Sequence, residues 1–313
     1  MSPTSADGHR RPTAADGVLV VDKPAGWTSH DVVARLRRLA ATRKVGHAGT
    51  LDPMATGVLV VGVGKATRLL AYLSGADKAY AATIRLGAST VTDDAEGDVL
   101  AVTDASGITR EAVEAGARAL SGDILQVPAT VSAIKVAGER AYARVRAGET
   151  VELAARPVTV SRFEVLATRS AELGGTAVLD VDVEVVCSSG TYVRALARDL
   201  GAGLGVGGHL TALRRTRVGG FALDVARTLE QLADEPDDRP LPVLPLADAA
   251  RATFPVRALS DDEAAALGYG KAIGARDGDA AATTAAIGTD GTLVALLEPK
   301  DGALRPVVVF APA

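Results

Sequence analysis

The chain has 313 residues, 48% of them hydrophobic and only 3% aromatic, with a formal net charge of −4. This length allows one large domain with a small one, or two medium domains, with a core built mostly from alanine, valine and leucine. The single cysteine, Cys187, excludes an intrachain disulfide and a cysteine zinc cluster, and the four histidines lack metal-binding spacing. We therefore expect no metal site.

The N-terminal segment, residues 1–15, has no apolar stretch of the kind found in signal peptides and is predicted to be a flexible lead-in. No uninterrupted apolar run reaches the ~18 residues of a membrane span. The expectation is a reduced, soluble, cytoplasmic protein with no membrane partner.

The first elements of the chain read as strand, helix, strand and helix. Residues 17–26 form an apolar run that Pro24 and Gly26 end. Thr28 and Asp31 have the spacing of a capping box at the start of an amphipathic helix. A buried strand is predicted at residues 58–64, followed by a short helix at 65–75.

Two later segments alternate apolar and polar residues, as half-buried strands do. In residues 76–87 the alternating apolar positions are Tyr80, Ala82, Ile84 and Leu86. Residues 179–187 place three acidic side chains on the opposite face from their apolar ones. This pattern favours an antiparallel sheet with one wet face.

Helices are expected at residues 109–121 and 138–147, and again after the turn at 188–191, with Thr191 as the N-cap. Strands and helices mix without a regular βαβ order, which indicates the α+β class. Residues 229–254 are acidic and proline-rich, as interdomain linkers are. The remaining residues, 255–313, alternate short apolar runs with glycine-rich turns and are predicted to form a small β-rich domain.

Basic residues gather in two segments despite the negative net charge. Between residues 35 and 68 the only acid is Asp52, and residues 201–221 contain three arginines and no acid. Local charge governs the binding of polyanions, so these segments are candidate nucleic-acid contacts. Ordinary solvated charged faces are the alternative.

The sequence lacks the motifs of three common kinds of site: a P-loop, a paired-carboxylate glycosidase site and a serine nucleophile elbow. The stretch GVGKAT at 62–67 lacks the P-loop pattern, because Leu59 and Ala66 occupy positions that need glycine and serine or threonine. Asp52 has no acidic companion in its loop, as paired-carboxylate glycosidases require. No G-x-S-x-G nucleophile elbow occurs.

The stretch KVGHAGTLDPMATGVLVVGVGKAT, residues 44–67, resembles the signature loop of the TruB family of bacterial tRNA pseudouridine-55 synthases. Further blocks resemble the same family in the same order: VDKPAGWTSHDVV, KAYAATIRLGASTVTDDAEG, CSSGTYVRALARDLG and GGHLTALRRTRVGGF. Together they cover about 200 residues. The resemblance is therefore much more specific than any single short motif.

The resemblance implies a pseudouridine synthase catalytic domain around a mixed, largely antiparallel sheet, with a small C-terminal PUA-like RNA-binding domain. On this basis the expected division is 1–15 flexible, 16–228 catalytic, 229–254 linker and 255–313 PUA-like. The implied reaction turns uridine 55 in the T loop of tRNA into pseudouridine by base flipping, without a cofactor.

The resemblance also implies catalytic residues. Asp52 would supply the catalytic carboxylate, and the residues leave open whether it attacks the sugar, attacks the ring or removes a C2′ proton. Arg194 would pair with Asp52 and keep it ionised by depressing its pKa. Tyr80 would lie against the uracil and handle a proton late in the reaction.

Further residues are expected to bind the substrate. His47 would contact the RNA near the flipped nucleotide, and Tyr192 and Leu213 would line the pocket. Lys23, with Pro24, would shape the pocket wall. The candidate phosphate contacts are Arg43, Lys44, Arg214 and Arg215.

Two other functions stay open on sequence grounds. A non-catalytic RNA-binding protein would have no need for a carboxylate such as Asp52 close to phosphates. A synthase that acts on another RNA, or that an accessory RNA guides, is weakly disfavoured because the chain lacks a long basic extension. A monomer is expected.

Overall fold

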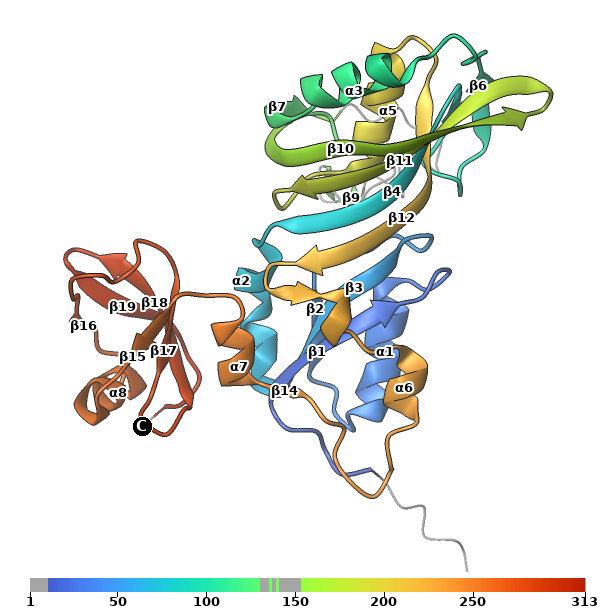
Figure 1. The fold of residues 1–313 in the computed structure, drawn as a ribbon. Helices are drawn as coiled ribbons and strands as arrows, with labels where there is room; N and C mark the ends of the chain where they lie inside the picture. The colour runs from blue at the N-terminus through green and yellow to red at the C-terminus, as the bar shows by residue number, and fades with distance from the viewer. Residues whose placement is uncertain (1–10, 130–134, 137–138, 141–152, 313) are drawn as a thin grey trace, which may run out of the picture.

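The structure, a computed structural model, describes residues 11–129, 135–136, 139–140 and 153–312. Two sheets dominate it, and they lie in separate parts of the molecule (Figure 1). The expected α+β class is confirmed. In the part of the chain that the structure describes, no helix is long and apolar enough to cross a membrane.

Counted over the described residues, the larger sheet has ten strands. They are β1 (Gly17–Lys23), β2 (Val45–Ala48), β3 (Thr56–Val63), β4 (Lys78–Leu86), β7 (Gly122–Gln126), β10 (Arg156–Leu173), β11 (Thr176–Cys187), β12 (Gly208–Val218), β13 (Phe221–Ala222) and β14 (Leu244–Pro245). Their order is β14-β1-β3-β12-β4-β11-β10-β7, with β2 beside β3 and β13 beside β12. The β3–β12 pair is parallel, and β12 pairs with β4 antiparallel. The sheet is therefore mixed and largely antiparallel, as expected.

The alternating sequence of β11 produces a sheet with one buried face. Val181, Val183 and Val185 are buried, whereas Asp180, Asp182 and Glu184 between them are partly exposed. Strand β11 pairs with β4 and β10, so its apolar face joins one continuous core. The period of two thus decides which face of this sheet packs against helices.

Helices pack against the larger sheet, and α8 (Asp261–Gly268) packs against the smaller sheet. The other helices are α1 (Ser29–Leu39), α2 (Leu70–Ser74), α3 (Arg110–Ala119), α5 (Val193–Gly203), α6 (Leu229–Ala233) and α7 (Leu246–Arg251), with 3₁₀ turns η1 (Gly64–Arg68) and η2 (Leu223–Val225). The capping box predicted from Thr28 and Asp31 is present at the start of α1. The N-cap predicted for α5 is wrong: Tyr192 holds that position, without a side-chain cap, and Thr191 lies one residue earlier.

The helix expected at 138–147 lies mostly outside the described residues. Where the structure describes this segment, Glu139–Arg140 is strand β9, paired with β8 (Lys135–Val136), so a helix there is wrong. A second two-stranded pair is formed by β5 (Ala88–Thr90) and β6 (Val99–Val102).

The smaller sheet forms the C-terminal part of the molecule. Its strands, in spatial order, are β15 (Val256–Ala258), β17 (Thr284–Ile287), β18 (Leu293–Lys300), β19 (Ala303–Val309) and β16 (Ile273–Gly274). Its buried residues form a core of their own around Leu267, Leu297 and Leu304.

The two sheets are joined by a shared hydrophobic cluster. Helix α7 contacts both β1 and β17, and it lies between the two parts in Figure 1. Phe310 packs in the same cluster as Val58 and Leu69, and the Arg68 guanidinium lies 4.9 Å from the Phe310 ring centre. Residues 229–254, predicted to be a linker, form α6, β14 and α7 here.

Candidate active site

Asp52 lies in the loop that joins β2 to β3. Ser29 of α1 binds the backbone of the preceding residue, Leu51, in both directions: Leu51 N donates to Ser29 Oγ, which donates to Leu51 O. The Gly26 N–H donates to the carbonyl of Pro53 at 2.9 Å. Backbone bonds on both sides of Asp52 therefore hold the carboxylate in place.

Lys23 lies beneath this loop. Its amine is fully buried and donates to the carbonyls of Pro24, Trp27 and Pro53. Burial lowers the pKa of Lys23 to about 8. These bonds tie the end of β1 to the Asp52 loop, while Lys23 itself is not among the residues that line the pocket beside Asp52, so its role in shaping the pocket wall stays a prediction.

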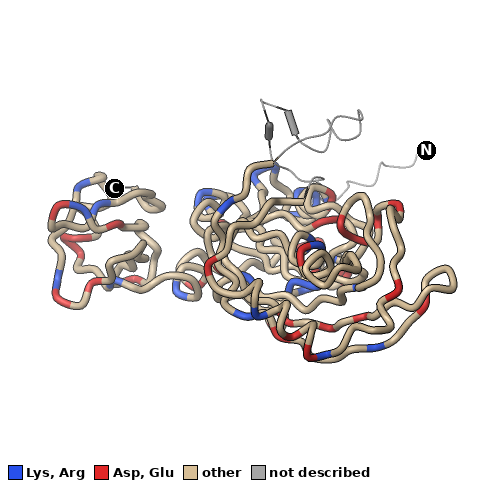
Figure 2. The backbone as a smooth tube through the Cα atoms, turned by 90° about the horizontal axis from the view of Figure 1, so that it is seen from above, with Lys and Arg blue, Asp and Glu red and all other residues tan. Residues whose placement is uncertain are grey.

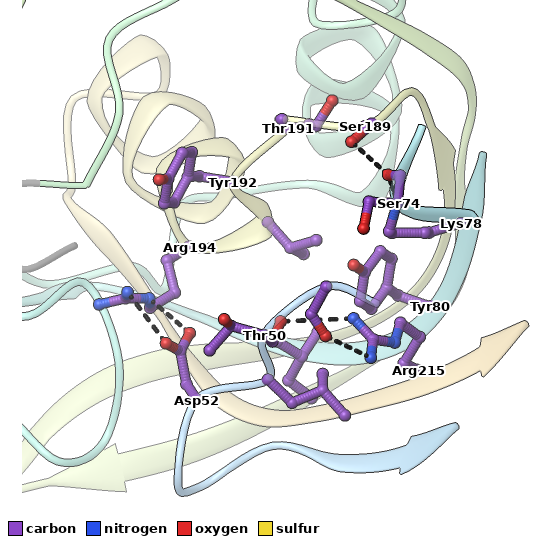
Figure 3. Close-up of a pocket in the computed structure, with 15 residues that line it drawn as sticks. Thr50, Asp52, Ser74, Lys78, Tyr80, Ser189, Thr191, Tyr192, Arg194 and Arg215 are labelled. Carbon is purple, nitrogen blue, oxygen red and sulfur yellow. Dashed lines mark hydrogen bonds and ion pairs between the residues drawn. The ribbon is translucent and has the colours of Figure 1, made fainter. Parts of the chain in front are cut away.

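Arg194 forms a two-pronged ion pair with Asp52. Its Nε lies 3.0 Å from Oδ2 of the carboxylate, and its Nη2 donates to Oδ1 at 3.3 Å (Figure 3). Arg194 is the second residue of α5 and is buried, whereas the Asp52 side chain is 36% exposed. The pair expected from the resemblance is present, and its fork geometry fixes the carboxylate plane.

Burial raises the pKa of Asp52 above its ordinary value, and the Arg194 guanidinium opposes that rise. Arg194 therefore lowers the pKa of Asp52 as expected, but burial outweighs this effect and the net shift is upward. Removing the carboxylate from water disfavours its charged form, and this effect exceeds the attraction to the arginine.

Asp94 is a second carboxylate beside Arg194 that the sequence reading missed. It is 2% exposed, and its Oδ2 lies 3.5 Å from Nη1 of Arg194. The same Nη1 donates to the Thr92 carbonyl at 2.8 Å. Asp94 belongs to the acidic stretch at 92–98, which lies outside both basic segments of the sequence. The signal that could have found it is its place inside one of the blocks of family resemblance.

A pocket of about 300 Å³ opens next to the Asp52–Arg194 pair. Tyr80, Tyr192 and Leu213 line it, so the structure brings these three expected residues together with the expected catalytic pair (Figure 3). The pocket combines apolar walls with a few convergent polar groups, as small-molecule sites do. Among the described residues, no cluster of three or more His, Cys, Asp or Glu side chains could hold a metal ion.

The two tyrosines are held by different means. Tyr80 lies on β4 and is 7% exposed, and burial raises the pKa of its phenol. Tyr192 is held through its backbone, because the Gln126 side chain donates to its carbonyl and accepts from its N–H. The sequence reading missed this amide clamp from the end of β7. One aromatic residue therefore comes from a strand and the other from the N-cap position of a helix.

His47 lies on β2, upstream of the Asp52 loop. Its ring makes an edge-to-face contact with that of His30 at a centroid distance of 5.6 Å. Burial lowers the pKa of His47, and the charge of His30 adds to this effect. This contact joins α1, which carries His30, to β2, and His47 does not line the pocket itself.

The basic residues fall into different environments. Arg43 and Lys44 are exposed at the turn before β2. Arg214 forms an ion pair with Asp22 at 2.7 Å, and Arg215 is 1% exposed, which does not fit the phosphate contact expected of it. Lys65 and Arg68 donate to the carbonyls of Phe310 and Val309, so part of the basic segment joins the two sheets. Figure 2 shows Lys and Arg in both parts of the chain, interspersed with Asp and Glu.

Three family models match the chain. Residues 37–193 match the N-terminal domain of TruB family pseudouridylate synthases. Residues 194–241 match the tRNA pseudouridylate synthase B C-terminal domain, and residues 254–311 match the C-terminal model of tRNA pseudouridine synthase II.

Curated relatives are similar to the chain over nearly its whole length. A protein from Arthrobacter sp. (strain FB24), named tRNA pseudouridine synthase B, is 62% identical over 304 residues, which is 95% of this chain and 97% of the relative. Proteins of the same name from Thermobifida fusca (strain YX) and Nocardia farcinica (strain IFM 10152) are 60% and 61% identical. They cover 95% and 97% of this chain, and 99% and 96% of their own lengths.

Solved structures share the fold at lower identity. A chain of a Cbf5-Nop10-Gar1 complex is 29% identical with a TM-score of 0.70, covering 95% of this chain and 85% of that one. A chain of an H/ACA RNP bound to a substrate RNA containing 2′-deoxyuridine is 29% identical with a TM-score of 0.66, at the same coverage.

Proposed function

This chain belongs to the TruB family of pseudouridylate synthases, and we propose that it converts uridine 55 in the T loop of tRNA to pseudouridine. The observation that carries the proposal is the Asp52–Arg194 pair at the mouth of a pocket lined by Tyr80 and Tyr192. The names of the relatives at 60–62% identity support tRNA as the substrate.

The reaction is an isomerisation. The N1–C1′ glycosidic bond breaks, the uracil rotates within the pocket, and a C5–C1′ bond forms. The C5 proton is then lost and N1 gains a proton, so atoms balance without a co-reactant. A pocket that closes on the detached base is needed, because a base released to water would not recombine with the same ribose.

Asp52 is the proposed catalytic carboxylate. Its oxygens are held by Arg194 and by the anchored loop, so little reorganisation is needed when a charge develops at C1′. Attack on the sugar, attack on the ring and removal of a C2′ proton all require the ionised form of Asp52.

Tyr80 and its neighbours are proposed to hold the base. A phenol ring on β4 offers a flat apolar surface for the uracil, and its hydroxyl lies in the pocket where a proton must move. Leu213 and Tyr192 line the same pocket. These side chains restrict the free base to rotation about an axis through its ring.

RNA binding is proposed to extend beyond the pocket. Flipping the uridine out of the T loop costs a few kcal/mol of stacking. We expect His47 to contact the part of the RNA from which the nucleotide flips out, because His47 lies on β2 just before the Asp52 loop. Arg43, Lys44 and Arg214 are the proposed phosphate contacts, and the C-terminal PUA-like domain, at about residues 255–313, adds RNA surface. A monomer acting in the cytoplasm completes the proposal.

An unmodified T-arm stem-loop transcript tests this function. Wild type, Asp52→Ala and Asp238→Ala are each incubated with the transcript, and pseudouridine is mapped by carbodiimide labelling and primer extension. Asp238 is the matched control, because its carboxylate is 76% exposed in the segment after α6. The expected result is one modified uridine with wild type and Asp238→Ala, and none with Asp52→Ala. If wild type binds the transcript and modifies no uridine, the T-arm proposal is wrong, and other RNAs become the candidates.

A further inference from the structure

Arg215 lies between the two parts of the site. Its backbone on β12 is paired with Tyr80 on β4 in an antiparallel register and with Gly57 at the start of β3 in a parallel one. A Cβ on Gly57, whose φ is +100°, would come within 2.2 Å of the Arg215 carbonyl oxygen, so only glycine permits this approach. Arg215 is therefore the direct neighbour of both the Tyr80 strand and the end of the Asp52 loop.

The Arg215 side chain binds both ends of the Asp52 loop. Its Nη2 donates to the Gly49 carbonyl at 3.1 Å and its Nη1 to the Thr50 carbonyl at 3.4 Å, where the loop begins (Figure 3). Its Nε donates to the Val58 carbonyl at 2.7 Å, after the loop has ended. One planar guanidinium thus spans the loop that carries Asp52.

This guanidinium is buried at 1% exposure. Within the described residues no carboxylate lies within 4.0 Å of it. Burial lowers the pKa of Arg215, and the Tyr80 hydroxyl and the Asp52 charge oppose this fall. Burying a charge without a close counter-ion is unfavourable. A neutral side chain could donate to one or two of these carbonyls without burying a charge, so the charge itself needs a further reason.

The reason lies in the pocket. Arg215 lines it together with Tyr80 and Asp52, and its presence lowers the pKa of the Tyr80 phenol against the effect of burial. The same side chain therefore acts on the position of the carboxylate loop and on the hydroxyl of the aromatic ring.

We propose that Arg215 is a positioning residue that holds the Asp52 loop and the Tyr80 ring in fixed register on either side of the base. The inference rests on the proposed function for its catalytic consequence, but its structural content does not depend on the RNA. Lysine cannot replace it, because one ammonium cannot reach carbonyls at both ends of the loop in the plane of a guanidinium.

The test compares Arg215→Lys and Arg215→Met with Arg217→Lys and Arg217→Met. Arg217 is the matched control, because it lies on the same strand, is partly exposed, and donates to Asp77 and the Gly219 carbonyl away from the pocket. The measurements are the single-turnover rate with saturating T-arm RNA, the RNA Kd and the melting temperature. Displacing reacting groups by about 1 Å slows chemistry by about 10²-fold. We expect a loss of that order for Arg215→Met, a smaller loss for Arg215→Lys, Kd values within about threefold of wild type, and no change for the Arg217 variants.

A second experiment, chemical rescue, separates loss of the guanidinium from loss of folding. In Arg215→Ala, added methylguanidinium is expected to restore part of the single-turnover rate, whereas Arg217→Ala and Asp52→Ala gain nothing from it. A loss of RNA affinity with an unchanged saturated rate would mean that Arg215 contacts the RNA, and would overturn the proposal. The absence of rescue in a variant with a near-normal melting temperature would also overturn it.

A third arm needs no activity. Wild type, Arg215→Lys and Arg217→Lys are labelled with 3-fluorotyrosine, and the Tyr80 resonance among the five tyrosines is assigned by Tyr80→Phe. We expect the ¹⁹F resonance of Tyr80 to shift in Arg215→Lys alone. A shift in a protein that modifies no T-arm RNA would contradict the proposed function and leave the positioning role intact. An unmoved Tyr80 resonance in Arg215→Lys, with a wild type that modifies the T-arm RNA, would contradict the positioning role and leave the proposed function intact.

Discussion

At the scale of single residues, Asp52 is subject to two opposing influences on its charge. Burial raises the pKa of its carboxyl, and the guanidinium of Arg194 limits that rise. The carboxylate is the form that the reaction needs, so the rate should increase with pH through this raised pKa. The acidic limb of the rate profile therefore reports the local field at Asp52.

Replacing Arg194 by glutamine tests this balance. Loss of the cation leaves burial unopposed, so the acidic limb of the single-turnover rate should move to higher pH, with a lower plateau because the carboxylate loses its fork. The control is Arg85→Gln, which removes a similar fork to Asp180 elsewhere on the sheet. An acidic limb that stays in place in Arg194→Gln would show that the charge of Arg194 does not act on Asp52.

Asp94 should matter through Arg194. Its buried carboxylate lies 3.5 Å from the guanidinium, so Asp94→Asn removes one of the groups that orient Arg194. We expect about a tenfold lower single-turnover rate, equivalent to about 1.4 kcal/mol, with RNA Kd unchanged. The matched control is Asp98→Asn, in the same acidic stretch but at an exposed position. Equal losses in the two variants would remove the argument for Asp94.

At the scale of elements, helix α1 is a support for the catalytic loop. Its capping box at Thr28 fixes where the helix begins, and this places Ser29 against Leu51 of the loop. The position of Asp52 thus depends on a helix that begins 23 residues earlier in the chain.

Replacing Ser29 by alanine should remove two hydrogen bonds that hold the Asp52 loop against α1. The substitution leaves the N–H and the carbonyl of Leu51 without their shared partner in a buried site, at a cost of about 1–3 kcal/mol of unfolding free energy. Urea denaturation measures this loss, and the single-turnover rate should fall with it. Ser161→Ala is the control, because the Ser161 hydroxyl bonds the Val186 carbonyl at an exposed position. If Ser29→Ala loses no more unfolding free energy than Ser161→Ala, water replaces the serine hydroxyl at Leu51.

The alternation and capping patterns show how far elements follow from local sequence. The capping box of α1 and the faces of β11 are as predicted, because each depends on residues a few positions apart. The prediction of Thr191 as the N-cap of α5 is wrong, because Tyr192, whose backbone is extended, holds that position and Thr191 lies outside the helix. Helix boundaries depend on how a turn packs, and here the Gln126 side chain holds the Tyr192 backbone.

At the scale of the whole molecule, the C-terminal sheet is attached by packing and by charge. Phe310 is 2% exposed within a cluster that includes residues of β3 and α2, and Arg68 lies against its ring. The interface is therefore more than a tether through residues 229–254.

Phe310→Ala tests this attachment. Truncating a buried phenylalanine costs about 3–5 kcal/mol, and here the cavity would open between the two sheets. We expect a lower melting temperature and faster proteolysis near residues 252–255, with the saturated single-turnover rate largely kept. The control is Tyr269→Ala, whose side chain on the same part of the molecule is 72% exposed and should leave stability unchanged. Equal stability of the two variants would mean that the sheets are joined only by the chain.

The sequence by itself determined what depends on nearby residues and on ordered motifs: the α+β class, the strand faces, the first helix and the family. It also singled out Asp52, Arg194 and Tyr80, which the structure brings to one pocket. Only the tertiary structure decided the burial of Arg215, the place of Asp94, the direction of the Asp52 pKa shift and the use of Arg68 between the sheets. The physical reason is that burial and charge balance depend on partners far apart in the chain: Asp52 and Arg194 are separated by 142 positions.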